Sequence, residues 1–404
     1  MPEIKEQQKR VVFVSETLPL GGTSTFALNV CSGLRDIGGW EGVAAGLCGL
    51  GEFGQQIRTR DLECLVPANS AVLHEQRIED LYRQCAQLAP RAVVAALSSG
   101  SFDFLRVVPK GCVRIGMIQS DEEGFYQLVN RHLPWLDAVA GVSLEICRKM
   151  EQRLGDRRIP VFHQPYGVPM PTFTKPRSGS GKLRILYLGR VIEEQKRVSM
   201  MTRIMRATLQ SGANLEWTIA GDGRDLEFLK SQFTKSDQVR FLGAVHYQDV
   251  PKVLTEHDAY FLCSDYEGLP LSLLEAMGEG LIPVVSDLPS GISEVVNEGT
   301  GIRVGIHDEA GFVTGLTDLA GDPIRRAALS AGAAEGVRKN YSTQAMASRW
   351  TEMLEKLLPA EVPIWKPHCR ASAPLELQDK WLYHPALRPI RVMAKHLKGT
   401  MQAP

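Results

Sequence analysis

Short aliphatic runs alternate with longer amphipathic stretches through most of the 404 residues of the chain. In the first part of the sequence these runs lie at 10–14, 42–48, 92–97, 113–118 and 137–142. Strands separated by helix-length segments pair in parallel, because the helix carries the chain back to the starting edge of the sheet. The runs are almost wholly apolar, which is typical of strands covered on both faces. The sequence therefore predicts doubly wound α/β architecture.

The alternation is interrupted at residues 169–184, where PMPTFTKPRSGSGKLR combines proline, glycine, serine and basic residues. Such a composition is typical of a linker. Beyond it, strand-like runs lie at 184–190, 215–221, 239–243, 259–264, 282–286 and 301–304, and helical patterns at 308–319, 323–340 and 343–357. We expect a Rossmann-like domain at 1–170, a linker at 171–183, a second Rossmann-like domain at 184–345, and a C-terminal helix and tail at 346–404.

Composition excludes several classes of protein. Lys plus Arg and Asp plus Glu both number 46, so no general attraction to nucleic acid is expected. No apolar run is long enough to span a bilayer, and the polar start MPEIKEQQKR lacks a secretory signal. The eight cysteines form no C-x-x-C pair or zinc-type spacing. We therefore expect a cytoplasmic protein with free thiols.

The most informative stretch is SDYEGLPLSLLEAMGEGLIPVVSD, at 264–287, which follows a strand directly. Pro270 suits the first position of a helix, so Glu267 is expected in the preceding loop and Glu275 in the helix. The amino end of a helix offers free N–H groups to an anion. Ligands of open α/β sheets collect at the carboxyl ends of the strands, where this loop should lie. The stretch therefore predicts an anionic ligand.

Glu267, seven intervening residues and Glu275 match the E-x7-E motif of the retaining GT-B glycosyltransferases grouped as family 4, which this chain resembles. The resemblance implies two Rossmann-like domains facing a cleft, with the donor bound mainly by the second. It implies that Glu275 holds the ribose hydroxyls and Glu267 the hydroxyls of the transferred sugar. It also implies that the backbone around Gly268, Leu269, Pro270 and Leu271 contacts sugar and phosphate. The alternative is that Glu267 caps the helix and Glu275 is a solvated charge.

A second element, YLGRVIEEQKR at 187–197, ends a strand at Gly189 and is followed by Arg190 and Lys196. In the family, an arginine and a lysine at this spacing grip the donor pyrophosphate. Fixed cations stabilise the nucleotide diphosphate that leaves as the glycosidic bond breaks. The alternative is that both residues are ordinary surface cations.

Two weaker signals follow in the second domain. Gly221 and Gly223 allow a sharp turn between a strand and the next helix. This turn is expected to approach the nucleotide, but close packing of the helix explains the glycines equally well. The segment Gly243–Tyr247, centred on Val245, follows the next strand, and in the family backbone atoms there contact the base. No side chain in that segment identifies the base.

In the first domain, Gly21 and Gly22 join the first strand to a helix, and in many relatives this loop nears the donor phosphates. A two-glycine turn is also ordinary strand-to-helix chemistry. After the run at 113–118 stand Gln119, Ser120 and Asp121, where comparable enzymes often carry a histidine. Glutamine can orient a hydroxyl but cannot act as a general base. Asp121 is the carboxylate candidate, with a helix amino cap as its alternative.

No D-x-D or H-E-x-x-H pattern is present, so we expect neither a metal nor a cofactor beyond the nucleotide sugar. The expected function is transfer of a sugar, from a UDP-sugar by preference, to an acceptor hydroxyl with retention of configuration. The rivals are a nucleotide-sugar epimerase or hydrolase, and a noncatalytic nucleotide-sugar-binding subunit. The basic, proline-broken segment 381–398 is expected to pack on the first domain, with peripheral membrane contact as the alternative.

Overall fold

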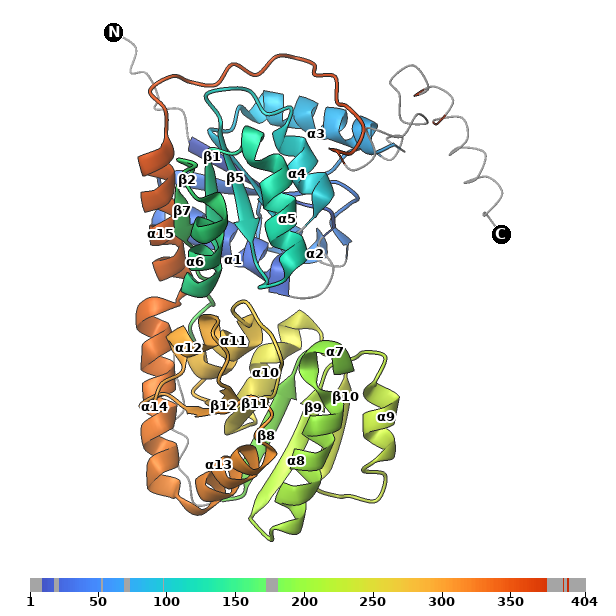
Figure 1. Ribbon diagram of the computed structural model, residues 1–404, viewed down its shortest axis with the longest axis vertical. Helices are drawn as coiled ribbons and strands as arrows, with labels where there is room; N and C mark the ends of the chain where they lie inside the picture. Colours follow the sequence, from blue (N-terminus) through green and yellow to red (C-terminus); the bar gives the residue numbers. More distant parts are fainter. Residues whose placement is uncertain are drawn as a thin grey trace. The chain divides into compact units, whose positions relative to one another are not determined.

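The structure is a computed structural model that describes residues 9–17, 22–51, 54–68, 73–96, 98–171, 181–375, 388 and 391. The chain divides into two compact units (Figure 1). The first contains the described residues up to Gly141, Cys147–Gln164, and the described residues from Ala347 onward. The second contains Val142–Ile146 and Pro165–Met346. The boundary therefore lies at Gln164, a few residues before the expected linker, most of which is outside the described residues.

The first unit is built on a seven-stranded, wholly parallel sheet with the order β3-β2-β1-β4-β5-β6-β7. Its strands are β1 (Lys9–Ser15), β2 (Trp40–Gly46), β3 (Cys64–Leu65), β4 (Ala92–Ala96), β5 (Val113–Ile118), β6 (Ala138–Gly141) and β7 (Val161–His163). Its sheet is flanked by α1 (Gly22–Ile37), α2 (Gly54–Thr59), α3 (His74–Leu88), α4 (Ser99–Leu105), α5 (Glu123–His132), and α6 (Leu144–Leu154), which starts in the second unit. Five of the seven strands match the expected aliphatic runs, and the short edge strands β3 and β7 were not expected.

The second unit is built on a six-stranded parallel sheet with the order β10-β9-β8-β11-β12-β13. Its strands are β8 (Leu183–Leu188), β9 (Leu215–Ala220), β10 (Val239–Gly243), β11 (Ala259–Leu262), β12 (Ile282–Ser286) and β13 (Ile302–Val304). Its helices are α7 (Glu193–Lys196), α8 (Val198–Gln210), α9 (Leu226–Ser231), α10 (Val250–Thr255), α11 (Leu271–Gly278), α12 (Gly291–Val295), α13 (Glu309–Gly321) and α14 (Pro323–Asn340). Helix α15 (Thr343–Leu357) begins here and continues into the first unit.

Aromatic contacts mark the core of each unit. In the first, Phe13 of β1 lies edge-on to Phe26 of α1 and to Trp350 of α15, with ring centroids 5.8 and 5.2 Å apart. In the second, Phe261 of β11 lies edge-on to Trp217 and Phe312 at 5.0 and 5.3 Å. Such aromatic pairs contribute stability beyond that of the apolar area that they bury, so they help to hold the helices on the sheets.

The segment after α15 follows the surface of the first unit. Trp365 packs its ring 5.2 Å from that of Tyr82 and donates its indole N–H to the carbonyl of Pro90. Further on, the backbone N–H of Ala371 donates to Glu79. The basic segment 381–398 lies outside the described residues except for Arg388 and Arg391. No helix within the described ranges is both long and apolar enough to cross a bilayer.

Candidate functional site

In the second sheet, the strand order reverses between β8 and β11. The chain runs outward from β8 to β9 and β10, then returns to the other side of β8 with β11. Helices that follow neighbouring strands on opposite sides leave an opening at the carboxyl ends of those strands, which is the usual ligand position in such sheets. Arg190 follows β8, and Glu267 follows β11. The expected donor residues therefore flank this reversal point.

Lys196 and Glu267 form a buried ion pair between the loops that follow these two strands. Lys196 is the last residue of α7 and is 9% exposed, and Glu267 is 7% exposed. Lys196 is thus not the surface cation of the alternative interpretation. A buried pair of this kind fixes the positions of two charges, and both charges lose their hydration. Removal of one partner leaves the other charge buried without a counter-charge.

Gln195 connects the two sides of the site. Its Oε1 accepts a hydrogen bond from Arg190 Nη2 at 2.9 Å. Its Nε2 donates to the carbonyl of Tyr266 at 3.1 Å and approaches Glu267 Oε2 at 3.4 Å. Its backbone carbonyl accepts the N–H of Asp265 at 3.0 Å. Gln195 is only 6% exposed, whereas Arg190 is exposed. The buried amide of Gln195 therefore holds the Arg190 side chain in place relative to the Glu267 loop.

Helix α11 follows the Glu267 loop and carries Glu275. Pro270 is the residue immediately before the helix and has φ −64° and ψ 120°, so the helix starts at Leu271, one residue later than expected. No side chain caps its first turn. Burial raises the pKa of Glu275 to about 7. Glu275 is thus partly buried and not fully solvated, and Pro270, not Glu267, takes the capping position of the helix.

The Gly221 loop packs on the backbone of the Gly189 loop. Gly221 has φ 149° and Gly223 has φ 157°. A Cβ at Gly221 would overlap the carbonyl oxygen of Gly189, and one at Gly223 would overlap that of Val191. The close approach of two backbones thus accounts for both glycines.

The other backbone positions expected to contact the donor lie at the same edge of the sheet. The carbonyl of Gly268 accepts the N–H of Gly291 at 2.7 Å, and Leu269 is buried against that glycine. Val245 lies in the partly exposed loop after β10, whose last residue, Gly243, has φ 68°. Gly268, Leu271 and Val245 thus follow strand ends, as expected from the sequence.

In the first unit, Gln119 stands directly after β5 and is 6% exposed. Neither Nε2 nor Oε1 of its amide has a hydrogen-bond partner among the described residues. An unpaired buried amide is costly, so a protein that keeps one usually uses it for a ligand or water. Gln119 is therefore the residue of this unit with the clearest unused capacity to bind a polar group.

Asp121 accepts hydrogen bonds from Lys149 Nζ at 2.5 Å and from the hydroxyl of Tyr126 at 2.6 Å. The capping position of α5 is taken by Glu122, so the amino-cap interpretation of Asp121 is wrong. Of the two glycines expected near the phosphates, Gly22 is the exposed first residue of α1, and Gly21 lies outside the described residues.

Sequence reasoning missed the role of Gln195, which is defined by contacts with a loop 71 and 72 positions away. The only local signal was its place beside Lys196. It also missed Tyr187, whose hydroxyl donates to the carbonyl of Arg190 and so holds the backbone there.

Part of the second unit matches a known protein family. Residues 182–322 match the family model described as Glycosyl transferases group 1. The chain is 27% identical over 240 residues to a GDP-mannose-dependent monoacylated alpha-(1-6)-phosphatidylinositol monomannoside mannosyltransferase of Corynebacterium glutamicum, covering 54% of this chain and 62% of that protein. It is 37% identical over 124 residues to the amylovoran biosynthesis glycosyltransferase AmsK of Erwinia amylovora, covering 28% of this chain and 30% of that protein. The matches thus span less than two thirds of these relatives.

Solved structures resemble both units of the chain. A mutant of S. aureus TarM in complex with fondaparinux, alpha-GlcNAc-glycerol and UDP has a TM-score of 0.72 at 11% identity, over 86% of this chain and 100% of that chain. Anabaena HepE in complex with UDP and glucose has a TM-score of 0.69 at 14% identity, over 86% and 100%. At such identities the likeness concerns the fold. The chain therefore has the GT-B fold, and residues 182–322 of its second unit form a domain that matches the glycosyl transferases group 1 model.

Proposed function

We propose that this protein transfers a sugar from a nucleotide-diphosphate sugar to an acceptor hydroxyl, with retention of the anomeric configuration. The observation that carries the proposal is the grouping of Arg190, Lys196 and Glu267 around the point where the strand order of the second sheet reverses. Glu275 lies in the helix that directly follows the Glu267 loop. Cations there suit a pyrophosphate, and carboxylates suit the hydroxyls of ribose and sugar.

In the proposed reaction, the bond between the anomeric carbon and the phosphate oxygen breaks and a bond to the acceptor oxygen forms on the same face. The nucleotide diphosphate leaves with the electron pair of the broken bond, and its phosphate receives the proton of the acceptor hydroxyl. Arg190 and Lys196 stabilise the negative charge that develops on the leaving group, an effect that acts in the transition state. Glu267 holds hydroxyls of the transferred sugar, and Glu275 holds the ribose.

The first unit supplies the acceptor side in this proposal. Gln119 orients a hydroxyl of the sugar or acceptor through its unpaired amide, and the leaving phosphate takes the place of a protein base. Asp121, which Lys149 and Tyr126 hold, positions this loop. No divalent metal is required, because Arg190 and Lys196 supply the positive charge that a metal supplies elsewhere.

We propose a UDP-sugar as the donor, because the TarM and HepE structures both contain UDP. The mannosyltransferase of C. glutamicum uses GDP-mannose, so the base is the first property to test. A glycan, a lipid carrier and a small natural product are the acceptor classes. The enzyme would act in the cytoplasm, with acceptors at the membrane reached by peripheral contact.

The test is calorimetric titration of the full chain with UDP, GDP and ADP in the presence of a metal chelator, repeated with Glu275→Ala and Arg190→Ala. We expect one diphosphate to bind selectively and both variants to weaken it by at least about tenfold. Glu298→Gln, at an exposed position of the second unit, is the control and should bind as the wild type does. Folded protein that binds none of the three diphosphates would refute the proposal.

A turnover assay then separates the rival functions. Release of nucleotide from the matching sugar donor only when an acceptor is added supports transfer. Turnover without any acceptor identifies an epimerase or hydrolase. Binding without turnover across the three acceptor classes identifies a noncatalytic subunit.

A further inference from the structure

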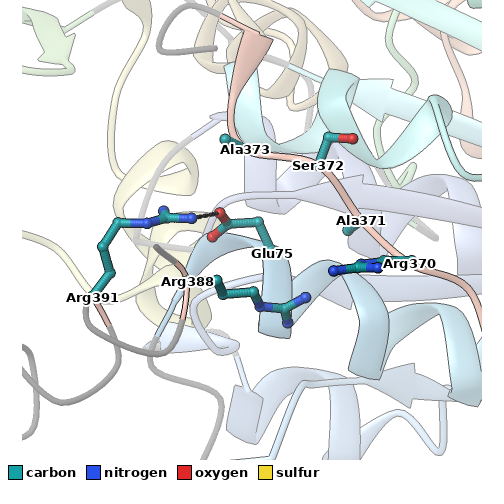
Figure 2. Close-up of a pocket in the computed structure, with 7 residues that line it drawn as sticks. All are labelled: Glu75, Arg370, Ala371, Ser372, Ala373, Arg388 and Arg391. Atoms are coloured by element: carbon teal, nitrogen blue, oxygen red, sulfur yellow. Dashed lines mark hydrogen bonds and ion pairs between the residues drawn. The ribbon is translucent and has the colours of Figure 1, made fainter. Parts of the chain in front are cut away.

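The first unit contains a pocket of about 300 Å³ whose lining includes none of the residues assigned above to sugar transfer. Its wall includes Glu75 from α3, Arg370 from the segment after α15, and Arg388 and Arg391 from further along the chain (Figure 2). Two parts of the chain that are distant in the sequence therefore meet at one cavity. Three of the four named side chains are arginines.

The pocket lies beside the first turn of α3, which contains Glu75. This helix follows β3 along the chain, so its amino end is at the carboxyl edge of the first sheet. Ligands of doubly wound sheets bind at that edge. The position of the pocket in the first unit is thus one that a ligand can use.

Two of the arginines have carboxylate partners. Arg391 Nη2 donates to Glu75 Oε1 at 2.7 Å, and both groups are nearly buried, with side chains 10% and 3% exposed. Arg388 forms a two-pronged pair with Glu79, at 2.8 and 2.6 Å. Arg370 is exposed and forms no ion pair with any described residue. Three guanidinium groups therefore face two carboxylates, which leaves an excess of one positive charge.

The guanidinium groups of Arg370 and Arg388 point toward one another in the pocket (Figure 2). Both act on the same carboxylate: burial raises the pKa of Glu79, but the hydrogen bonds from Arg388 and Ala371 and the nearby charge of Arg370 outweigh this and lower it. One carboxylate shared by two facing cations satisfies only part of their charge. An additional anion between the cations would relieve their mutual repulsion.

We propose that this pocket binds a phosphate-type anion between Arg370 and Arg388. Guanidinium groups present planar pairs of N–H donors that match two phosphate oxygens at once, and a phosphate has enough oxygens to serve both groups. The volume exceeds that of one phosphate, so a diphosphate also fits. Binding here does not depend on the transfer reaction, and the anion has two sources: a phosphate free in solution, or a phosphate that is part of a lipid headgroup.

The first arm of the test is calorimetric titration of the full chain with inorganic phosphate and with pyrophosphate. Arg370→Gln removes an exposed guanidinium that forms no ion pair with the described part of the chain, so the fold should be kept. An unchanged melting temperature checks this. We expect at least about tenfold weaker binding in Arg370→Gln, because a hydrogen bond between charged groups is lost. Arg158→Gln, at an exposed position elsewhere in the first unit, is the matched control and should bind as the wild type does.

Pyrophosphate could also bind among the residues proposed to hold the donor, so the titration is repeated with Lys196→Gln. A site that Arg370→Gln weakens and Lys196→Gln leaves intact is the pocket in the first unit. This result would stand even if no nucleoside diphosphate bound the protein. Equal binding by wild type and Arg370→Gln, or no binding of either anion by the folded wild type, would overturn the proposal.

The second arm distinguishes the two sources by sedimentation with vesicles of phosphatidylcholine, with and without phosphatidylglycerol. Co-sedimentation that requires phosphatidylglycerol and is lost in Arg370→Gln, but kept in Arg158→Gln, assigns the site to a lipid headgroup. Binding of the inorganic anions without such co-sedimentation assigns it to a soluble phosphate.

Discussion

Lys196 and Glu267 neutralise one another in a buried ion pair within the free protein. The cation proposed to grip the donor pyrophosphate is therefore already occupied by the carboxylate proposed to hold the sugar. A diphosphate that binds at Lys196 competes with Glu267 for the ammonium group, whereas an intact sugar donor offers hydroxyls to Glu267 at the same time. In the proposed donor site, this pair would therefore favour the complete donor over the bare nucleotide.

Glu267→Gln should bind the free nucleoside diphosphate more tightly than the wild type does, by about tenfold, because Lys196 is released from its counter-charge. Transfer should fall by at least about tenfold, because an amide holds the sugar hydroxyls less strongly than a carboxylate. Calorimetry and initial rates on the same preparations measure the two effects, with Glu298→Gln as control. Weaker nucleotide binding by Glu267→Gln would show that Glu267 does not compete with the phosphate.

Glu275 should make the second unit less stable as the pH rises from about 5 to 8. Burial raises the pKa of Glu275 from 4.5 to about 7, so between these values the folded state binds more protons than the unfolded state. The stability that this extra proton contributes is fully present below the pKa of Glu275 in the unfolded state. It is lost as the pH rises through the pKa of Glu275 in the folded state. The free energy of unfolding should fall by up to about 3 kcal/mol across this pH range because of Glu275, and Glu275→Gln should abolish that fall. Melting temperatures of both proteins across this range test it, and parallel curves would contradict it.

Gln195→Ala should weaken nucleoside diphosphate binding by about tenfold, because Arg190 loses the acceptor that orients it. If Gln195 acts through Arg190, the double variant with Arg190→Ala should be no weaker than Arg190→Ala alone. A double-mutant cycle measured by calorimetry gives the coupling free energy, expected at about 1 kcal/mol. Additive losses would assign Gln195 an independent contact with the ligand.

Gly221→Ala should destabilise the second unit by about 2 kcal/mol or more, because the added methyl group overlaps the carbonyl oxygen of Gly189 at a φ that alanine avoids. Gly336→Ala, in α14 of the same unit, is the matched control. Its Cβ would meet only Thr300 at ordinary contact distance, so it should stabilise the helix by about 1 kcal/mol. Differential scanning calorimetry compares the two. Equal melting temperatures would mean that the two loops can separate freely.

Gln119→Met should raise stability by about 1 kcal/mol while it lowers transfer, because it replaces an unpaired buried amide with an apolar chain of similar size. Thermal melting and an acceptor-dependent rate assay, run on the same samples, separate the two effects. A variant that is less stable than the wild type would indicate that an ordered water or another group satisfies the amide. Unchanged transfer would exclude Gln119 from the acceptor side.

Much of the fold could be read from the sequence because parallel strands covered on both faces are nearly continuous aliphatic runs. The runs 113–118, 239–243 and 282–286 are strands over the same residues in the structure. Strand β3, with two residues, and β7, with three, lie at the edges of their sheet and carry no such run. Edge strands need less burial, so the hydrophobic pattern does not reveal them.

The sequence predicted which elements carry the two glutamates of the motif. The spacing of Glu267 and Glu275 placed one residue in a loop and the other in a helix, because a proline marks the boundary between them. The pairing of Glu267 with Lys196 and the bridge through Gln195 depend on two loops that meet only when β8 and β11 become neighbours. Long-range side-chain geometry of this kind leaves no periodic signal in one sequence. The amino cap, which was the alternative role of Asp121, is wrong because the helix starts at Glu123 and Glu122 takes its capping position.

Trp350, near the end of the described chain, fills the core beneath Phe13 and Phe26, near its beginning. On the ribosome, β1 and α1 emerge more than three hundred positions before the aromatic ring that completes their packing. The strands of both sheets are made before that ring, because the last of them ends at Val304. A nascent chain stalled before α15 would therefore leave Phe13 and Phe26 without this partner and would present an open apolar surface to chaperones.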